Sequence, residues 1–176
     1  EDNSLSSVTT SSDAGMLMSI SRFESYVDEY GEQNDRSNEV ITYKNDGITI
    51  SSLQQFVYDA GADKPSQVIT YRGETAAPEN RQSVATFDSE GNVVSVTNYK
   101  LDGVSIENEQ SFIYNAEGAL AGILTEDANG IRMSETSFNS EGNVDTIINY
   151  KQDGVTIKDQ QTFTYSTSDV LESIET

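Results

Sequence analysis

The chain has 176 residues, and 30 Asp and Glu residues against 10 Lys and Arg residues give it a formal net charge of -20. The electrostatic field of such a charge repels phosphate backbones and anionic lipid, so we expect no nucleic-acid partner. We also expect no membrane insertion, because no apolar run is long enough for it. The absence of Cys and His excludes disulfides, thiolate chemistry and the commonest general base and metal ligand.

Residues 1–15 are rich in Ser, Thr, Asn and Asp, which predicts a flexible leader. Leaders of this kind often tether an exported domain to a signal or lipid anchor, so we expect an extracellular or cell-surface protein, such as a processed lipoprotein. A merely disordered end is the alternative interpretation. We assign residues 16–176 to a single repeat domain.

The segment 16–29 has two competing periodicities. Met18, Ile20 and Arg22 alternate as they would in a strand, whereas Phe23, Tyr26 and Tyr30 have helical spacing. We predict a strand, because each later half-repeat receives an incoming strand before its aromatic residue. A short helix that caps the first sheet edge is the alternative.

The remaining chain is repetitive. Residues 87–114 recur as residues 138–165, with identity at 16 of 28 positions. Two successive half-repeats make a 51-residue unit, and in each half-repeat an aromatic residue is followed by Gly and then by a Val, Leu and Ile pattern. The half-repeats start near Tyr30, Tyr58, Phe87, Tyr114, Phe138 and Tyr165. Both prolines, Pro65 and Pro78, lie in loops that lengthen the earlier half-repeats.

Turn signals divide each half-repeat. Asp-Gly and Asn-Gly pairs, such as Asp102-Gly103 and Asn129-Gly130, predict tight primed hairpin turns. The segments between them are rich in Val, Ile, Thr, Tyr and Phe, which favours strands. The sequence therefore predicts an all-β fold, an antiparallel meander of repeated β-hairpins that forms a single extended or curled sheet of about 12 strands.

The aromatic residues follow the repeat. Phe112 and Tyr114 share a parity, as do Phe163 and Tyr165, so each pair projects from one face of its strand. Stacked hairpins would align these rings into a cross-strand ladder that stabilises the sheet. This structural interpretation is favoured over a platform for ligand stacking.

The pairing of an aromatic residue with Asp or Asn, as in Tyr58-Asp59, Phe87-Asp88 and Tyr114-Asn115, followed by Gly and a returning Tyr, resembles the tyrosine-aspartate repeats of RHS-type bacterial proteins and teneurins. The resemblance extends from Tyr30 to the end of the chain. It implies β-hairpins added one after another into a long antiparallel sheet, and a secreted or surface-exposed scaffold. Asn92 and Asn143 stand where family repeats usually carry Arg, and no toxin or autoproteolytic segment is present.

Oxygen-bearing side chains recur at alternate positions around two Gly turns, in the pattern that Ca²⁺ would need. The spacing falls short of an EF-hand loop, and acidic turns that cap their own backbone are the favoured interpretation. The candidate calcium ligands are Asp88, Glu90, Asn92, Asn139, Glu141, Asn143 and Asp145. We expect no other cofactor.

These observations predict a non-catalytic, exported structural or binding module that contacts a protein or glycan. We expect no enzyme activity and name no catalytic residue, because the repeats place the same acids in every copy, whereas an active site normally breaks symmetry. A carbohydrate-active enzyme or its accessory domain is one alternative, since paired carboxylates could hydrolyse a glycoside. A toxin-immunity protein is the other.

Overall fold

The computed structural model describes residues 6–176, and nearly all of its regular structure is β-strand. The strands are β1 (Ser7–Ser11), β2 (Leu17–Val27), β3 (Gln33–Tyr43), β4 (Ile50–Val57), β5 (Gln67–Arg72), β6 (Arg81–Phe87), β7 (Val93–Tyr99), β8 (Ile106–Tyr114), β9 (Leu120–Asp127), β10 (Arg132–Phe138), β11 (Val144–Tyr150), β12 (Ile157–Tyr165) and β13 (Leu171–Glu175). One short 3-10 helix, η1 (Pro78–Asn80), separates β5 from β6.

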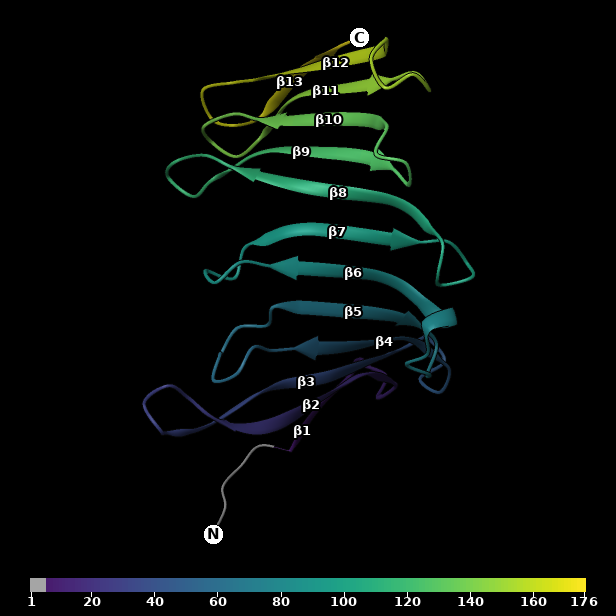
Figure 1. Ribbon diagram of the computed structural model, residues 1–176, viewed down its shortest axis with the longest axis vertical. Coiled ribbons are helices and arrows are strands. Elements are labelled where there is room, and N and C mark those ends of the chain that lie inside the picture. Colours follow the sequence, from purple (N-terminus) through teal and green to yellow (C-terminus); the bar gives the residue numbers. More distant parts are fainter. Residues whose placement is uncertain (1–5) are drawn as a thin grey trace. The chain divides into compact units, whose positions relative to one another are not determined.

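The thirteen strands form one sheet in the order in which they occur along the chain (Figure 1). Each consecutive pair whose register is defined runs antiparallel, for example β3 with β4 and β11 with β12. This confirms the predicted all-β antiparallel meander, with thirteen strands where about 12 were expected. A helix long and apolar enough to cross a membrane is not found among residues 6–176.

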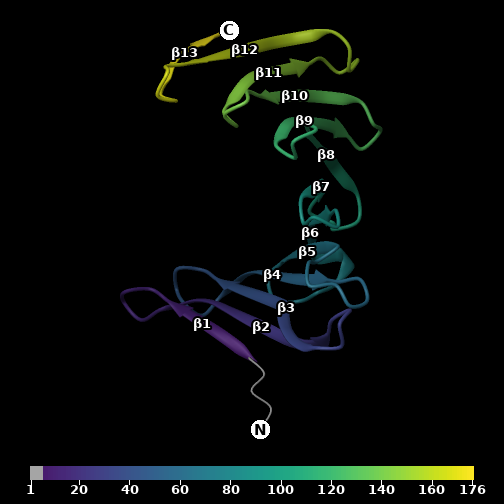
Figure 2. The same ribbon diagram turned by 90° about the vertical axis from the view of Figure 1, so that its left-hand side faces the viewer.

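The chain divides into two compact units, which are described separately. The first unit comprises Glu1–Val93 with Asn98–Ser105, and the second comprises Val94–Thr97 with Ile106–Thr176. In both units the strands follow one another through short turns, as the side view also shows (Figure 2). The longest strands, β2 and β3, have 11 residues each and lie in the first unit.

The N-terminal segment differs in part from its prediction. Strand β1 lies within residues 1–15, the segment predicted to be a flexible leader, and it pairs with β2 from Ser7 opposite Arg22 onward. Its five residues are all exposed. Residues 1–5 of the predicted leader lie outside the described part. The strand predicted over residues 16–29 is confirmed as β2.

The turns use Gly differently from the prediction. Most hairpins have a five-residue loop with two backbone hydrogen bonds. The N–H of the first loop residue donates to the carbonyl of the fifth, and the N–H of the fourth donates to the carbonyl of the first. These loops span residues 12–16, 28–32, 88–92, 115–119, 127–131, 139–143 and 166–170. Only the fourth residue has positive φ, which defines a turn followed by a left-handed residue and a bulge. A type I′ turn needs positive φ at both central residues, which Asn129 and Asp102 do not have, so the primed turns predicted at Asn129-Gly130 and Asp102-Gly103 are wrong. Asp169, with a φ of 58°, takes the Gly position in the last one.

The sheet has a small core. Ile41 on β3, Leu53 on β4 and Tyr71 on β5 are the buried hydrophobic residues among those described, and their registers place them directly opposite one another. Tyr43, Ile50 and Ile69 pack against this row. Cross-strand packing of this kind is the main stabilising contact available to a sheet.

The predicted alternation of the aromatic residues is confirmed strand by strand. At the end of β4, Phe56 and the next residue but one, Tyr58, are half-buried while Val57 between them is exposed. On β8, Phe112 and Tyr114 are half-buried while Ile113 is exposed. Tyr30 departs from this pattern, because it lies inside the 28–32 loop and is 83% exposed. Val27 takes the position before Asp28 that Phe87 takes before Asp88.

Candidate functional site

The proposed calcium ligands lie at two separate turns, and their oxygens are engaged in holding those turns. In the first, Asp88 Oδ1 accepts the backbone N–H of Asn92 at 2.7 Å, and Oδ2 accepts Asn92 Nδ2 at 3.0 Å. The hydrogen bond from the Asn92 side chain is the main reason that the pKa of Asp88 is lowered. Glu90 accepts a hydrogen bond from Ser89 Oγ at 3.0 Å.

The second turn repeats this arrangement. Asn139 Oδ1 accepts the backbone N–H groups of Glu141 and Asn143, at 3.1 and 2.9 Å. Asp145 lies on β11 and accepts a hydrogen bond from Ser137 Oγ at 3.4 Å. Within residues 6–176, no group of three or more Asp, Glu, His or Cys side chains is placed to hold a metal ion. Asp88 and Asn139 thus cap the backbone N–H groups of their own turns.

A second type of turn recurs three times with the sequence Lys-x-Asp-Gly. In the first instance Lys44 donates its N–H to the carbonyl of Thr49, and Asp46 Oδ1 accepts the N–H groups of Ile48 and Thr49 at 2.9 and 2.8 Å. The Thr49 hydroxyl donates to Asp46 Oδ2 at 2.5 Å. Residues 100–105 and 151–156 repeat this backbone pattern.

The aspartates of these turns carry a shared electrostatic signature. The pKa of each of Asp46, Asp102 and Asp153 is lowered to about 2, because the following Thr or Ser hydroxyl and two backbone N–H groups all donate to the carboxylate. A carboxylate that accepts three hydrogen bonds stays ionised and acts as the fixed centre of its turn. Such a group is unsuited to general acid catalysis near neutral pH.

Each of these turns displays an aliphatic side chain directly after its Gly. Ile48 is 82%, Val104 66% and Val155 79% exposed. The N–H of each of these residues is bound to the turn aspartate, at 2.9 to 3.0 Å. The backbone that carries each of these side chains is therefore held in place, while the side chain faces solvent. We call Ile48, Val104 and Val155 the aliphatic turn tips.

Sequence reasoning did not single out the aliphatic turn tips. The available signal was the recurrence of Ile or Val after each Asp-Gly pair, at a position where a polar residue would suit a solvated turn. The Lys-x-Asp-Gly turns were expected only to reverse the chain.

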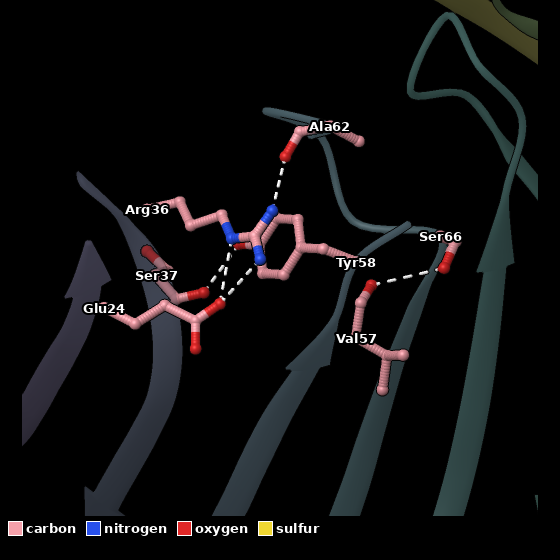
Figure 3. Close-up of polar contacts among 7 residues, drawn as sticks. All are labelled: Glu24, Arg36, Ser37, Val57, Tyr58, Ala62 and Ser66. Atoms are coloured by element: carbon pink, nitrogen blue, oxygen red, sulfur yellow. Dashed lines mark hydrogen bonds and ion pairs between the residues drawn. The ribbon is translucent and has the colours of Figure 1, made fainter. Parts of the chain in front are cut away.

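A polar cluster in the first unit anchors the loop that carries Pro65 (Figure 3). The Arg36 guanidinium lies between the rings of Tyr26 and Tyr58, at 4.5 and 4.0 Å from their centroids. It pairs with Glu24 at 2.8 Å and donates to the carbonyl of Ala62 at 2.6 Å. Because every charge and donor here has a partner, the cluster is a structural clamp.

Tyr58 completes the clamp. Its hydroxyl donates to the carbonyl of Ser37 at 2.6 Å, and burial raises the pKa of Tyr58. Further along the same loop, Lys64 Nζ donates to the carbonyl of Glu90 at 2.6 Å. The loop that carries Pro65 is thus fixed to β3 and to the 88–92 loop.

No protein-family model and no curated protein matches the sequence. Solved structures similar to it include a porin-like protein from Bacteroides uniformis, with 13% identity and a TM-score of 0.37, over 96% of this chain and 80% of that one.

Two toxin structures are also similar. The Photorhabdus luminescens Tc holotoxin pore has 13% identity and a TM-score of 0.33, and the TcdB2-TccC3 structure has 12% identity and a TM-score of 0.35. Each match covers 95% of this chain and 11% of the other, so the chain spans a small part of the toxin chains' length. Likenesses at these scores carry no inference about function.

Proposed function

We propose that this chain is a non-catalytic structural or binding repeat module of the tyrosine-aspartate type, which acts at the cell surface or outside the cell by contacting a protein or glycan. Its hairpin meander agrees with that family in outline, and the aromatic-Asp and aromatic-Asn pairs that begin its turns support the finer resemblance. The extracellular assignment rests on this resemblance.

The observation that carries the proposal is the fixed display of the aliphatic turn tips. Exposed aliphatic side chains gain free energy when a partner covers them, at about 25 cal/mol per Å² of buried apolar surface. A backbone already fixed by hydrogen bonds loses little conformational entropy when the side chains that it carries are bound. The turn aspartates supply this preorganisation in all three Lys-x-Asp-Gly turns.

The acidic surface shapes the choice of partner. A chain with a net charge of -20 disfavours anionic partners and favours neutral or basic ones. Contact through aliphatic side chains should persist at high salt, because hydrophobic burial is not screened as surface charge pairs are. Salt resistance therefore distinguishes the proposed contact from simple charge attraction.

The test applies the labelled full chain to immobilised glycans and to intact bacterial cells, with and without surface proteolysis, at low and high salt. We expect saturable binding that survives high salt, and no release of reducing ends from any glycan that binds. Loss of cell binding after proteolysis would identify the partner as a protein. Release of reducing ends would instead support the carbohydrate-active enzyme alternative, and absence of saturable binding in every format would overturn the proposal.

A further inference from the structure

A cavity of about 630 Å³ lies in the second unit, where the end of β11 and the start of β12 face the start of β10. Its wall includes the apolar residues Ile131 and Met133 and the ring of Tyr150. Three cationic side chains also line it: Arg132, Lys151 and Lys158. The cavity is open to solvent, and none of the aliphatic turn tips lines it.

The charge of this wall is opposite to that of its surroundings. Arg132, Lys151 and Lys158 are the only Lys or Arg residues among residues 94–97 and 106–176, and all three converge on the one cavity. One acid, Asp127, shares the wall, so the lining carries a net positive charge within a strongly acidic chain. A small anion would be attracted here and repelled from most of the remaining surface.

The three cations are differently engaged. Arg132 pairs with Glu135 at 3.1 Å and lies 5.2 Å from the centroid of Tyr150, which fixes its position. Lys158 lies 3.8 Å from Asp159, a carboxylate that also accepts Asn149 Nδ2 at 2.6 Å. The Lys151 ammonium has no hydrogen bond or ion pair among residues 6–176. Lys151 and Lys158 are therefore the cations with capacity for a ligand.

The corresponding place in the first unit holds an additional arginine, Arg72. Arg81 lies over Tyr99 at 5.0 Å, as Arg132 does over Tyr150 51 residues later. There, however, the guanidinium of Arg72 donates to the carbonyls of Arg81, Tyr99 and Lys100, at 2.7, 2.8 and 3.2 Å.

In the second unit the residue that ends the equivalent strand is Asp127. Its carboxylate accepts the N–H groups of Asn129 and Ile131 in its own turn, at 2.8 and 2.9 Å. The longer loop with η1 is replaced by this five-residue turn. Lys158 also departs from the repeat, since the residue 51 positions earlier is Glu107. At this place the second unit thus lacks the arginine of the first unit, Arg72, and has an additional cation, Lys158.

We propose that this cavity binds a small organic anion with an apolar body, such as an alkyl or aryl carboxylate. The carboxylate lies between the ammonium groups of Lys151 and Lys158, and the apolar body contacts Ile131, Met133 and the Tyr150 ring. A mostly apolar wall with a few convergent polar groups is the usual composition of a small-molecule site.

The test is an amide NMR titration of the full chain with three probes: octanoate, octyl glucoside and inorganic phosphate. We expect octanoate to shift the amide resonances of residues 131–133 and 149–152 in a saturable manner. Octyl glucoside, which is neutral, and phosphate, which has no apolar body, should leave these resonances unshifted. Equal shifts with octyl glucoside would show an apolar patch alone, and equal shifts with phosphate would show charge alone. Either result, or no localised shift, would overturn the proposal.

Variants give the second readout. Lys158→Glu restores the residue found in the earlier repeat copy and is expected to weaken octanoate binding by about tenfold or more. Lys158→Gln, which removes the charge without reversing it, should have a smaller effect. Lys44→Glu changes the net charge equally but lies in the first unit, so it should leave the affinity unchanged. Equal losses in Lys44→Glu and Lys158→Glu would contradict the assignment.

Discussion

Gly103 packs directly against Pro78, since a Cβ added at Gly103 would lie 2.2 Å from the Pro78 carbonyl oxygen. The contact joins the second Lys-x-Asp-Gly turn to η1. Gly103 also has a φ of 68°, so two separate constraints favour glycine at this position.

A pair of alanine variants separates these constraints. Gly130 has a similar φ of 74°, and a Cβ there would meet nothing within 4 Å. We expect Gly130→Ala to lower the free energy of unfolding by about 1 kcal/mol, the cost of left-handed backbone. Gly103→Ala should cost more, because it must also displace η1. Urea denaturation of both variants measures the difference, and equal costs would show that the contact with η1 contributes nothing.

The Arg36 clamp depends on the shape of the guanidinium as well as on its charge. Arg36→Lys keeps the charge but cannot stack between Tyr26 and Tyr58 while also reaching Glu24 and Ala62. We expect a loss of about 1 to 3 kcal/mol in the free energy of unfolding. Arg22→Lys is the matched control, because Arg22 is mostly exposed and pairs only at the surface with Glu39.

Thermal unfolding of the two lysine variants gives the answer. The Arg36 variant should melt clearly below wild type and the Arg22 variant close to it. A midpoint for the Arg36 variant that equals the Arg22 control would mean that the stack adds no stability.

Local signals in the sequence were sufficient to predict the strands and their order in the sheet. The alternation around Phe112 and Tyr114 and the repeated Gly positions predict hairpins, and β2 follows from the alternation of Met18, Ile20 and Arg22. The turn type was mispredicted because Asp-Gly suits several hairpin loops. The choice among them depends on loop length and register, which cross-strand pairing decides.

Other features depend on contacts between distant residues. Tyr26, Arg36 and Tyr58 come from β2, β3 and the end of β4, and no spacing in the sequence indicates that they stack. The cavity beside Lys158 lies where the second unit has Asp127 in place of Arg72, whose guanidinium bonds to backbone carbonyls in the first unit. The loss of this arginine side chain becomes visible only when the two units are compared in three dimensions.

The pKa of Asp153 provides a solution test of the Lys-x-Asp-Gly geometry. Its value of about 2 lies below the ordinary 3.8, so the associated stabilisation is present above about pH 4 and is lost as the pH falls towards 2. The hydrogen bond from the Thr156 hydroxyl is the largest cause. In Thr156→Val we therefore expect the pKa of Asp153 to rise towards its ordinary value. Carbon-13 NMR titration of the carboxyl group measures it, and an unchanged midpoint would remove the hydroxyl from the explanation.

Calcium should have little effect on stability. The oxygens of Asp88 and Asn139 already accept hydrogen bonds from their own turns, so a bound ion would have to displace those bonds. We expect the thermal midpoint to be the same with millimolar Ca²⁺ and with chelator. Sodium chloride at equal ionic strength is the control for screening of the -20 charge. A rise specific to Ca²⁺ would restore the calcium hypothesis for these turns.

The chain is proposed to work by binding through the aliphatic turn tips. The most direct measurement compares the affinity of wild type, of the triple variant Ile48→Ser, Val104→Ser, Val155→Ser, and of a control triple variant Val57→Ser, Val94→Ser, Ile113→Ser, for the glycan or cell surface that binds wild type. The control removes exposed aliphatic side chains from strands instead of turns. We predict about tenfold or greater loss for the turn variant and little change for the control. Equal affinities for wild type and the turn variant would contradict the account.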